Sequence, residues 1–147
     1  MANSDRPSAP IRDQTPADGY SRPGLLYIDD SPTALRTIRR AMHAYGLLLE
    51  TFTSVQAMRE RPPGPIIAVL LDVDLGGGHN GLDVARDLRD ERADLPIAFI
   101  TADMAEDRLD ALRAIGPVFP KNADVAPAVE WLVAQSQRTE IPLSESG

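Results

Sequence analysis

The chain has 147 residues and a net charge of −7, with 22 acidic against 15 basic residues, which argues against nucleic-acid binding because that needs clustered basic side chains. Apolar residues make up 43% of it, enough for one core, and the lack of cysteine excludes disulfides, thiolate metal sites and a cysteine nucleophile. No apolar run has transmembrane length and the N-terminus lacks a secretory-type apolar stretch, so we expect a cytoplasmic protein without membrane contact.

Both ends of the chain differ in composition from its middle. Residues 1–23 hold four prolines among polar residues and show no helical or strand period, which predicts a disordered tail. Residues 137–147 are polar and end in Ser-Glu-Ser-Gly, which predicts a second, flexible tail. One folded domain over residues 24–136 is therefore expected.

Short apolar runs alternate with helical patterns along the predicted domain. In chain order, the predicted elements are a strand at 25–28, a helix at 32–45, a strand at 47–52, a short helix at 54–58, a strand at 66–71, a helix at 82–88, a strand at 95–100, a helix at 104–115, a strand at 118–119 and a helix after 124. Ser31 and Pro32 suit the start of the first helix, as its N-cap and first-turn proline. The run at 66–71 is the most apolar in the chain, which indicates a buried central strand.

This alternation predicts an α/β fold with a five-stranded parallel sheet and helices on both faces. In open sheets of this kind, ligand sites lie beyond the carboxyl ends of the strands. The polar residues at those ends should therefore converge: Asp29, Asp30, Asp72, Thr101 and Lys121.

The residue types at the strand ends favour phosphoryl chemistry with a metal ion. Carboxylates gathered at one rim repel each other unless a cation lies between them, and Mg²⁺ prefers such oxygen ligands. A carboxylate can also act as the nucleophile that forms an acyl phosphate, with a lysine and a hydroxyl contacting the phosphoryl oxygens. Lys121 is the only lysine among the 15 basic residues, which indicates a position that needs a compact ammonium group.

The ordered set Asp29-Asp30, Asp72, Thr101-Ala102 and Lys121 resembles the receiver domain of two-component response regulators, over residues 24–135. The resemblance implies the flavodoxin-like (βα)5 receiver fold and a signalling function rather than an enzymatic one. It also implies a sensor histidine kinase or histidine phosphotransfer protein as partner, whose phosphohistidine is the phosphoryl donor.

The resemblance assigns roles within the predicted site. Asp72 would accept the phosphoryl group, Thr101 would be the switch hydroxyl, and Lys121 would bind the phosphate. For Mg²⁺, Asp72 and Asp30 would be direct ligands, Asp29 would act through a metal-bound water, and the backbone carbonyl of Asp74 would complete the set. Because few residues follow the last helix, we expect a single-domain regulator that signals through its own surface, to a downstream protein or as a homodimer.

The chain departs from the usual receiver pattern at three positions. Gly76 and Asn122 stand where the family usually has proline, and Val118 stands at the usual aromatic switch position. Two other functions fit parts of the sequence. The Asp72-Val73-Asp74 segment also resembles the first motif of haloacid-dehalogenase-type phosphatases, and a receiver-like binding module without phosphorylation is the second alternative.

Overall fold

The computed structural model describes residues 24–76, 78–121 and 123–146, with side chains as far as residue 138, and the tail predicted at 1–23 lies outside this part. The main sheet has five strands, all paired in parallel. Across the sheet they lie in the order β3 (Glu50–Phe52), β2 (Leu25–Ile28), β4 (Ala68–Asp72), β7 (Ile97–Thr101) and β8 (Val118–Pro120). The predicted parallel sheet, with the run before Asp72 at its centre, is therefore confirmed.

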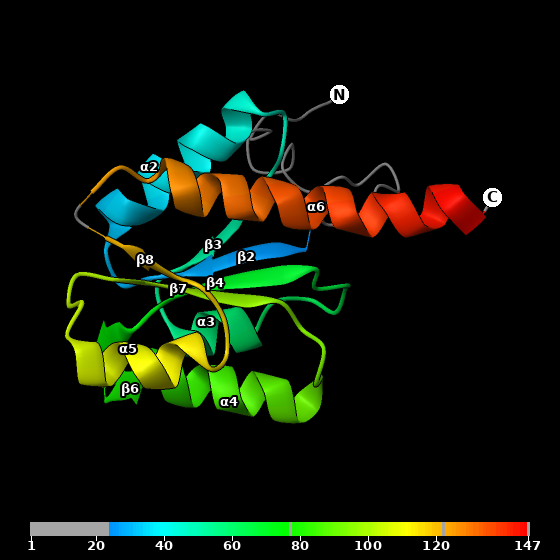
Figure 1. Cartoon of the computed structure of the whole chain (residues 1–147). Helices are drawn as coiled ribbons and strands as arrows, with labels where there is room; N and C mark the ends of the chain where they lie inside the picture. The colour runs from blue at the N-terminus through cyan, green and yellow to red at the C-terminus, as the bar shows by residue number, and fades with distance from the viewer. Residues whose placement is uncertain (1–23, 77, 122, 147) are drawn as a thin grey trace.

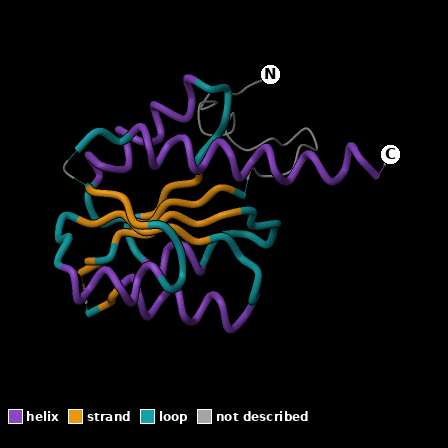
Figure 2. Tube along the Cα trace, viewed as in Figure 1, coloured by secondary structure: helices purple, strands orange, loops and turns teal. Residues whose placement is uncertain are grey.

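Helices cover both faces of this sheet, as the sequence predicted (Figures 1 and 2). Helices α2 (Pro32–Ala44) and α6 (Ala126–Ser146) lie on one face. Helices α3 (Val55–Arg59), α4 (Gly81–Glu91) and α5 (Glu106–Arg113) lie on the other. None of the helices in the described part of the chain is long and apolar enough to cross a membrane.

Alternating strand side chains build one core layer on each face of the sheet. On β4, Leu70 packs with the α2 and α6 side, whereas Leu71 packs with the α3, α4 and α5 side. All five residues of β4 are buried, which explains why its sequence is continuously apolar up to Asp72. Burying a leucine side chain contributes about 1.5–3 kcal/mol, so the core fixes the strand ends firmly in place.

Local capping explains where the helices next to the site begin. The Ser31 side chain accepts a hydrogen bond from the backbone N–H of Ala34 at 3.2 Å, and Pro32 opens α2. Asn80 caps α4 in the same way, accepting from the backbone N–H of Leu82 at 2.7 Å. Both caps hold a helix start directly beside a strand end that carries an aspartate.

The structure differs from the sequence prediction in several element boundaries. The second strand starts only at Glu50, and the helix predicted at 104–115 is confined to Glu106–Arg113. Helix α6 continues to Ser146, ten residues beyond the predicted end of the domain at Ser136. The domain boundaries remain predictions.

The segment after Asp72, between the strand predicted at 66–71 and the helix predicted at 82–88, forms a small antiparallel ribbon. It pairs β5 (Asp74–Gly76) with β6 (His79–Asn80), and the register shifts between Asp74 and Gly76. Gly76 has a φ of 73°, a left-handed conformation that side chains with a Cβ rarely adopt. The ribbon places Asp74 and Gly76 at the rim of the sheet, close to the strand ends.

Candidate functional site

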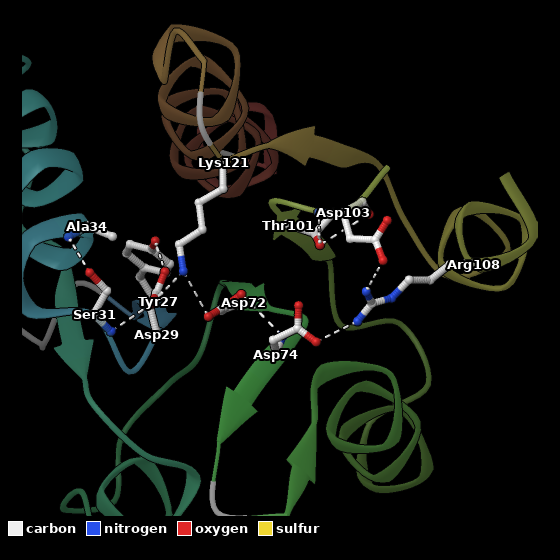
Figure 3. Close-up of polar contacts among 10 residues, drawn as sticks. All are labelled: Tyr27, Asp29, Ser31, Ala34, Asp72, Asp74, Thr101, Asp103, Arg108 and Lys121. Carbon is white, nitrogen blue, oxygen red and sulfur yellow. Dashed lines mark hydrogen bonds and ion pairs between the residues drawn. The ribbon is translucent and has the colours of Figure 1, made fainter. Parts of the chain in front are cut away.

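Three strand ends meet at the carboxyl edge of the sheet and bring Asp29, Asp72 and Lys121 into contact (Figure 3). Asp29 follows β2, Asp72 ends β4, and Lys121 follows β8. The Lys121 Nζ donates to Asp29 Oδ1 at 2.9 Å and to Asp72 Oδ2 at 3.0 Å. These side chains, predicted to converge from their positions after separate strands, therefore form one ion-pair cluster.

Asp29 is held by protein donors at both of its oxygens. Besides Lys121, its Oδ1 accepts from the backbone N–H of Ser31 at 2.9 Å, and its Oδ2 accepts from the Tyr27 hydroxyl at 2.5 Å. Asp29 and Tyr27 are both fully buried. Burial, followed by the hydrogen bond to Asp29, raises the pKa of Tyr27, so this hydroxyl stays a donor. Asp29 is thus fixed in position behind the other carboxylates.

Asp72 is a buried carboxylate with a strongly perturbed environment. Its side chain is 2% exposed, and its Oδ1 accepts from the backbone N–H of Asp74 at 3.2 Å. Burial, and next the neighbouring charge of Asp29, raises the pKa of Asp72 to about 6, although Lys121 and the Asp74 amide act in the opposite direction. Burial lowers the pKa of Lys121, but its hydrogen bonds to both aspartates outweigh this and raise it. The pocket therefore holds more negative charge than Lys121 balances.

The carboxylates suit a divalent cation. One oxygen from each of Asp29, Asp30 and Asp72 lies within 4.8 Å of the others, and Asp30 is exposed at the rim. Hard oxygen donors with open access to water are what Mg²⁺ prefers, so these residues fit the predicted ion. The Asp74 carboxylate lies outside this group and pairs with Arg108 instead. A role for the Asp74 carbonyl as a metal ligand stays a prediction.

Thr101 lies at the same edge, and its hydroxyl is engaged by the backbone of Asp103 (Figure 3). Its Oγ1 accepts from the backbone N–H of Asp103 at 3.1 Å and lies 3.4 Å from the Asp103 carbonyl oxygen. The Thr101 carbonyl accepts from the backbone N–H of Lys121 at 2.8 Å, which fixes the end of β8 against the end of β7. The structure thus joins Thr101 to the site through the backbone of Lys121.

Two site residues escaped the sequence prediction. Arg108 on α5 pairs with Asp74 and Asp103 beside the site, yet an arginine on an exposed helix face carries no distinctive sequence signal. Tyr27 was assigned only to a strand. Its position two residues before Asp29 places both side chains on the same face of the strand, and this spacing is a signal that sequence reasoning could have used.

Gly81 allows helix α4 to begin against the backbone of Asp72. A Cβ at this position would lie 2.5 Å from the Asp72 carbonyl oxygen and 2.8 Å from the Cα of Val73. Any other residue would push the helix away from the strand end. The Gly81 amide donates to the Val73 carbonyl at 2.7 Å, which secures this close approach.

The comparisons with known proteins agree with the fold and with the geometry of the site. A family model described as the response regulator receiver domain matches residues 25–117. The photosynthetic apparatus regulatory protein RegA of Cereibacter sphaeroides is 40% identical over 80 residues, which cover 52% of this chain and 42% of RegA. The chain therefore corresponds to less than half the length of that relative. Lys121 lies beyond the matched range, so its place in the site rests on its contacts.

Solved receiver structures share the fold at low sequence identity. A CheY-like receiver domain protein from Methanospirillum hungatei has a TM-score of 0.67 at 13% identity, covering 80% of this chain and 96% of its own. The non-phosphorylated HemR receiver domain from Leptospira biflexa has a TM-score of 0.64 at 23% identity, covering 76% and 92%. A Burkholderia pseudomallei response regulator, solved with a phosphorylated aspartic acid and a calcium ion, has a TM-score of 0.62 at 18% identity, covering 84% and 74%. Together with the family match, these likenesses show that the chain belongs to the response regulator receiver family of two-component signalling, whose members are phospho-accepting modules rather than enzymes and whose partner is a histidine kinase.

Proposed function

We propose that Asp72 is the phospho-acceptor of this receiver and takes a phosphoryl group from the phosphohistidine of a sensor kinase or phosphotransfer protein. The observation that carries the proposal is the contact of Lys121 with two buried carboxylates, at 2.9 and 3.0 Å, at the end of the central strand. A buried carboxylate costs free energy unless it is paired or binds a cation. Here Lys121 pairs with Asp72, and further carboxylates lie beside it.

The reaction needs a nucleophile and positive charge, and the chain supplies both. An Asp72 carboxylate oxygen forms the bond to phosphorus while the bond from phosphorus to the donor imidazole nitrogen breaks, leaving the electron pair on the imidazole. The Lys121 ammonium contacts Asp72 already and can hydrogen-bond the incoming phosphoryl oxygens. Thr101 supplies a hydroxyl from the neighbouring strand end.

Mg²⁺ completes the proposed site. Asp30 and Asp72 would hold it directly, Asp29 would act through a bound water because its own oxygens accept from protein donors, and the Asp74 carbonyl would be a further ligand. When bound, the ion supplies positive charge that neutralises the phosphoryl oxygens. The solved Burkholderia pseudomallei regulator contains a phosphorylated aspartic acid together with a calcium ion, which agrees with such a pairing in this fold.

The phosphatase alternative requires the second aspartate of the Asp72-Val73-Asp74 segment to act as an acid or base on substrate. Here the Asp74 Oδ1 accepts from Arg108 at 2.7 Å, so this carboxylate is engaged by a guanidinium. That arrangement favours a receiver. We further propose that the protein acts in the cytoplasm as a single-domain regulator, passing its signal through its own surface to a downstream protein or a second copy, without nucleic acid.

Phosphorylation by a small acyl phosphate tests the proposal. The full chain incubated with acetyl phosphate and Mg²⁺ should gain one phosphoryl group, measured by intact mass, and chelation of the metal should prevent it. Asp72→Asn should abolish labelling, whereas the control Asp90→Asn, on the exposed face of α4, should label normally. Undiminished labelling of Asp72→Asn would refute the assignment, and multiple turnover of a phosphomonoester would favour the phosphatase.

A further inference from the structure

Arg108 forms an ion-pair clasp with Asp74 and Asp103 beside the site (Figure 3). The guanidinium donates through Nη2 to Asp74 Oδ1 at 2.7 Å and through Nη1 to Asp103 Oδ2 at 2.9 Å. The hydrogen bond to Asp74 is the main cause that raises the pKa of Arg108. One side chain on α5 therefore ties the segment after β4 to the segment after β7.

Each arm of the clasp is one hydrogen bond away from a residue of the proposed site. The backbone N–H of Asp74 donates to Asp72 Oδ1 at 3.2 Å, and the backbone N–H of Asp103 donates to Thr101 Oγ1 at 3.1 Å. The Asp103 carboxylate also accepts from the backbone N–H of Ala105 at 3.0 Å, just before α5 begins. While the clasp is formed, the Thr101 hydroxyl is therefore hydrogen-bonded to the backbone of Asp103 rather than to Asp72.

We propose that Arg108 is a positioning residue that holds the segment between β7 and α5 in its resting arrangement and so opposes the closure of Thr101 onto phosphorylated Asp72. The inference rests on the proposed function, because it concerns the response to a phosphoryl group on Asp72. For its hydroxyl to reach that group, Thr101 must release Asp103, and Asp103 is itself anchored to Arg108. The clasp therefore stabilises the unmodified state and weakens the coupling to phosphate.

The size of the effect follows from the exposure of the clasp. Arg108 is 26% exposed, while the Asp74 and Asp103 side chains are 63% and 55% exposed, so solvent screens both ion pairs. A ligand shifts a conformational equilibrium only by its difference in affinity for the two states. Release of one exposed arm should therefore change the apparent affinity for a phosphate mimic by about two- to five-fold.

Two variants with opposite effects on charge separate positioning from simple electrostatics. Arg108→Ala removes a positive charge and opens both arms of the clasp, whereas Asp103→Asn removes a negative charge and opens the Asp103 arm, so the two variants share the loss of that arm. The full chain at saturating Mg²⁺ is titrated with beryllofluoride, and the amide resonances of Thr101 and Lys121 report the response. Both variants should respond at about two- to five-fold lower beryllofluoride than wild type. Arg108→Lys, a point charge that cannot bridge both carboxylates, should lie in between.

Arg113→Ala is the matched control, because Arg113 is an exposed arginine near the end of the same helix. It should leave the midpoint of the titration unchanged. Midpoints that move in opposite directions in Arg108→Ala and Asp103→Asn would overturn the proposal in favour of a pure charge effect, and midpoints equal to wild type would overturn it outright. If wild type itself gave no response to beryllofluoride, the proposed function would fail, and this inference with it.

Discussion

The two ends of the sheet each hold a nearly buried charge cluster, and the clusters differ in their charge balance. At the amino end, Arg61 and Glu50 form a pair whose side chains are 6% and 11% exposed. At the carboxyl end, Asp29 and Asp72 are buried with Lys121 as their shared cation. The first cluster includes an ion pair of one guanidinium with one carboxylate, whereas the second has two buried carboxylates for one ammonium.

The amino-end cluster holds three chain segments together. Arg61 donates through Nε and Nη2 to the two Glu50 oxygens, both at 3.0 Å, which is the bidentate geometry that suits a guanidinium and a carboxylate. Glu50 also accepts from the backbone N–H of Gly24 at 3.1 Å, at the start of β2. The guanidinium meets its carboxylate partner in a fixed bidentate geometry, which fits a structural rather than a chemical use.

The carboxyl-end cluster, with its excess of negative charge, suits the proposed phosphorylation instead. A third carboxylate, Asp30, lies at its rim, and the excess negative charge contributes to the raised pKa of Asp72. Binding a cation stabilises such a site, which agrees with the proposed Mg²⁺. Burial alone therefore does not distinguish the proposed phosphorylation site from the Arg61–Glu50 ion pair, whereas the excess of buried carboxylates over ammonium groups does.

The largest predicted effect comes from unbalancing the amino-end cluster. Arg61→Met should lower the free energy of unfolding by about 3–5 kcal/mol, because it removes the ion pair and both guanidinium hydrogen bonds from a nearly buried Glu50 carboxylate. Urea denaturation measures the change. The double variant Arg61→Met/Glu50→Leu should recover most of the loss, because apolar residues of similar volume often replace a buried ion pair without cost.

The control for this variant is Arg59→Met, which breaks an exposed ion pair with Glu91 between α3 and α4. It should change stability by less than about 1 kcal/mol. Equal losses in Arg59→Met and Arg61→Met would mean that the amino-end pair is not special. The structural importance assigned to the buried Arg61–Glu50 pair would then be wrong.

The second effect has the opposite sign, because the carboxyl-end cluster is unbalanced already. The raised pKa of Asp72, from its ordinary 3.8 to about 6, means that the folded state binds this proton more tightly than the unfolded state. The stability of the metal-free protein should therefore fall as the pH rises from about 4 to about 6, with the full penalty above that window. Asp72→Asn should stabilise the protein by about 1–3 kcal/mol at pH 8 in EDTA.

Thermal or urea unfolding of both proteins across this pH range measures the difference. The advantage of Asp72→Asn should vanish near pH 4, where wild-type Asp72 is protonated as well. Asp94→Asn, at an exposed aspartate, is the control and should show no such trend. An advantage of Asp72→Asn that did not vary with pH would contradict the charge explanation.

Sequence periodicity predicts the secondary structure, and here it predicted the sheet, the helices and the aspartates at the carboxyl ends of β2 and β4. Asp29, Asp72 and Lys121 could be predicted to meet because the carboxyl ends of parallel strands share one edge. The ribbon after Asp72 could not, because residues 74–80 carry turn signals without any strand alternation. The extension of α6 beyond Ser136 was likewise hidden by a polar composition that also fits a tail.

Contacts between individual side chains could not be predicted from the sequence. The Arg108 clasp joins residues 34 apart in sequence, and the Arg61–Glu50 pair joins residues 11 apart, with no spacing that a periodic pattern would mark. Fourteen of the basic residues are arginine, so the sequence gives no reason to single out either of these two. Lys121 was found because its residue type is unique in the chain.

The smallest effect distinguishes the two neighbouring aspartates of the carboxyl-end cluster. Asp29 already accepts from Tyr27, Ser31 and Lys121, whereas Asp30 lies exposed at the rim, so Asp30 should be the direct Mg²⁺ ligand. Mg²⁺ at ten times its dissociation constant should stabilise wild type by about 1.4 kcal/mol. At the same Mg²⁺ concentration, Asp30→Ala should lose most of this gain and Asp29→Ala should lose less. Each variant is compared with its own metal-free form, which removes the cost of truncating buried Asp29. If Asp29→Ala lost the Mg²⁺ effect and Asp30→Ala kept it, the inner carboxylate would be the ligand and Lys121 would have to give way to the ion.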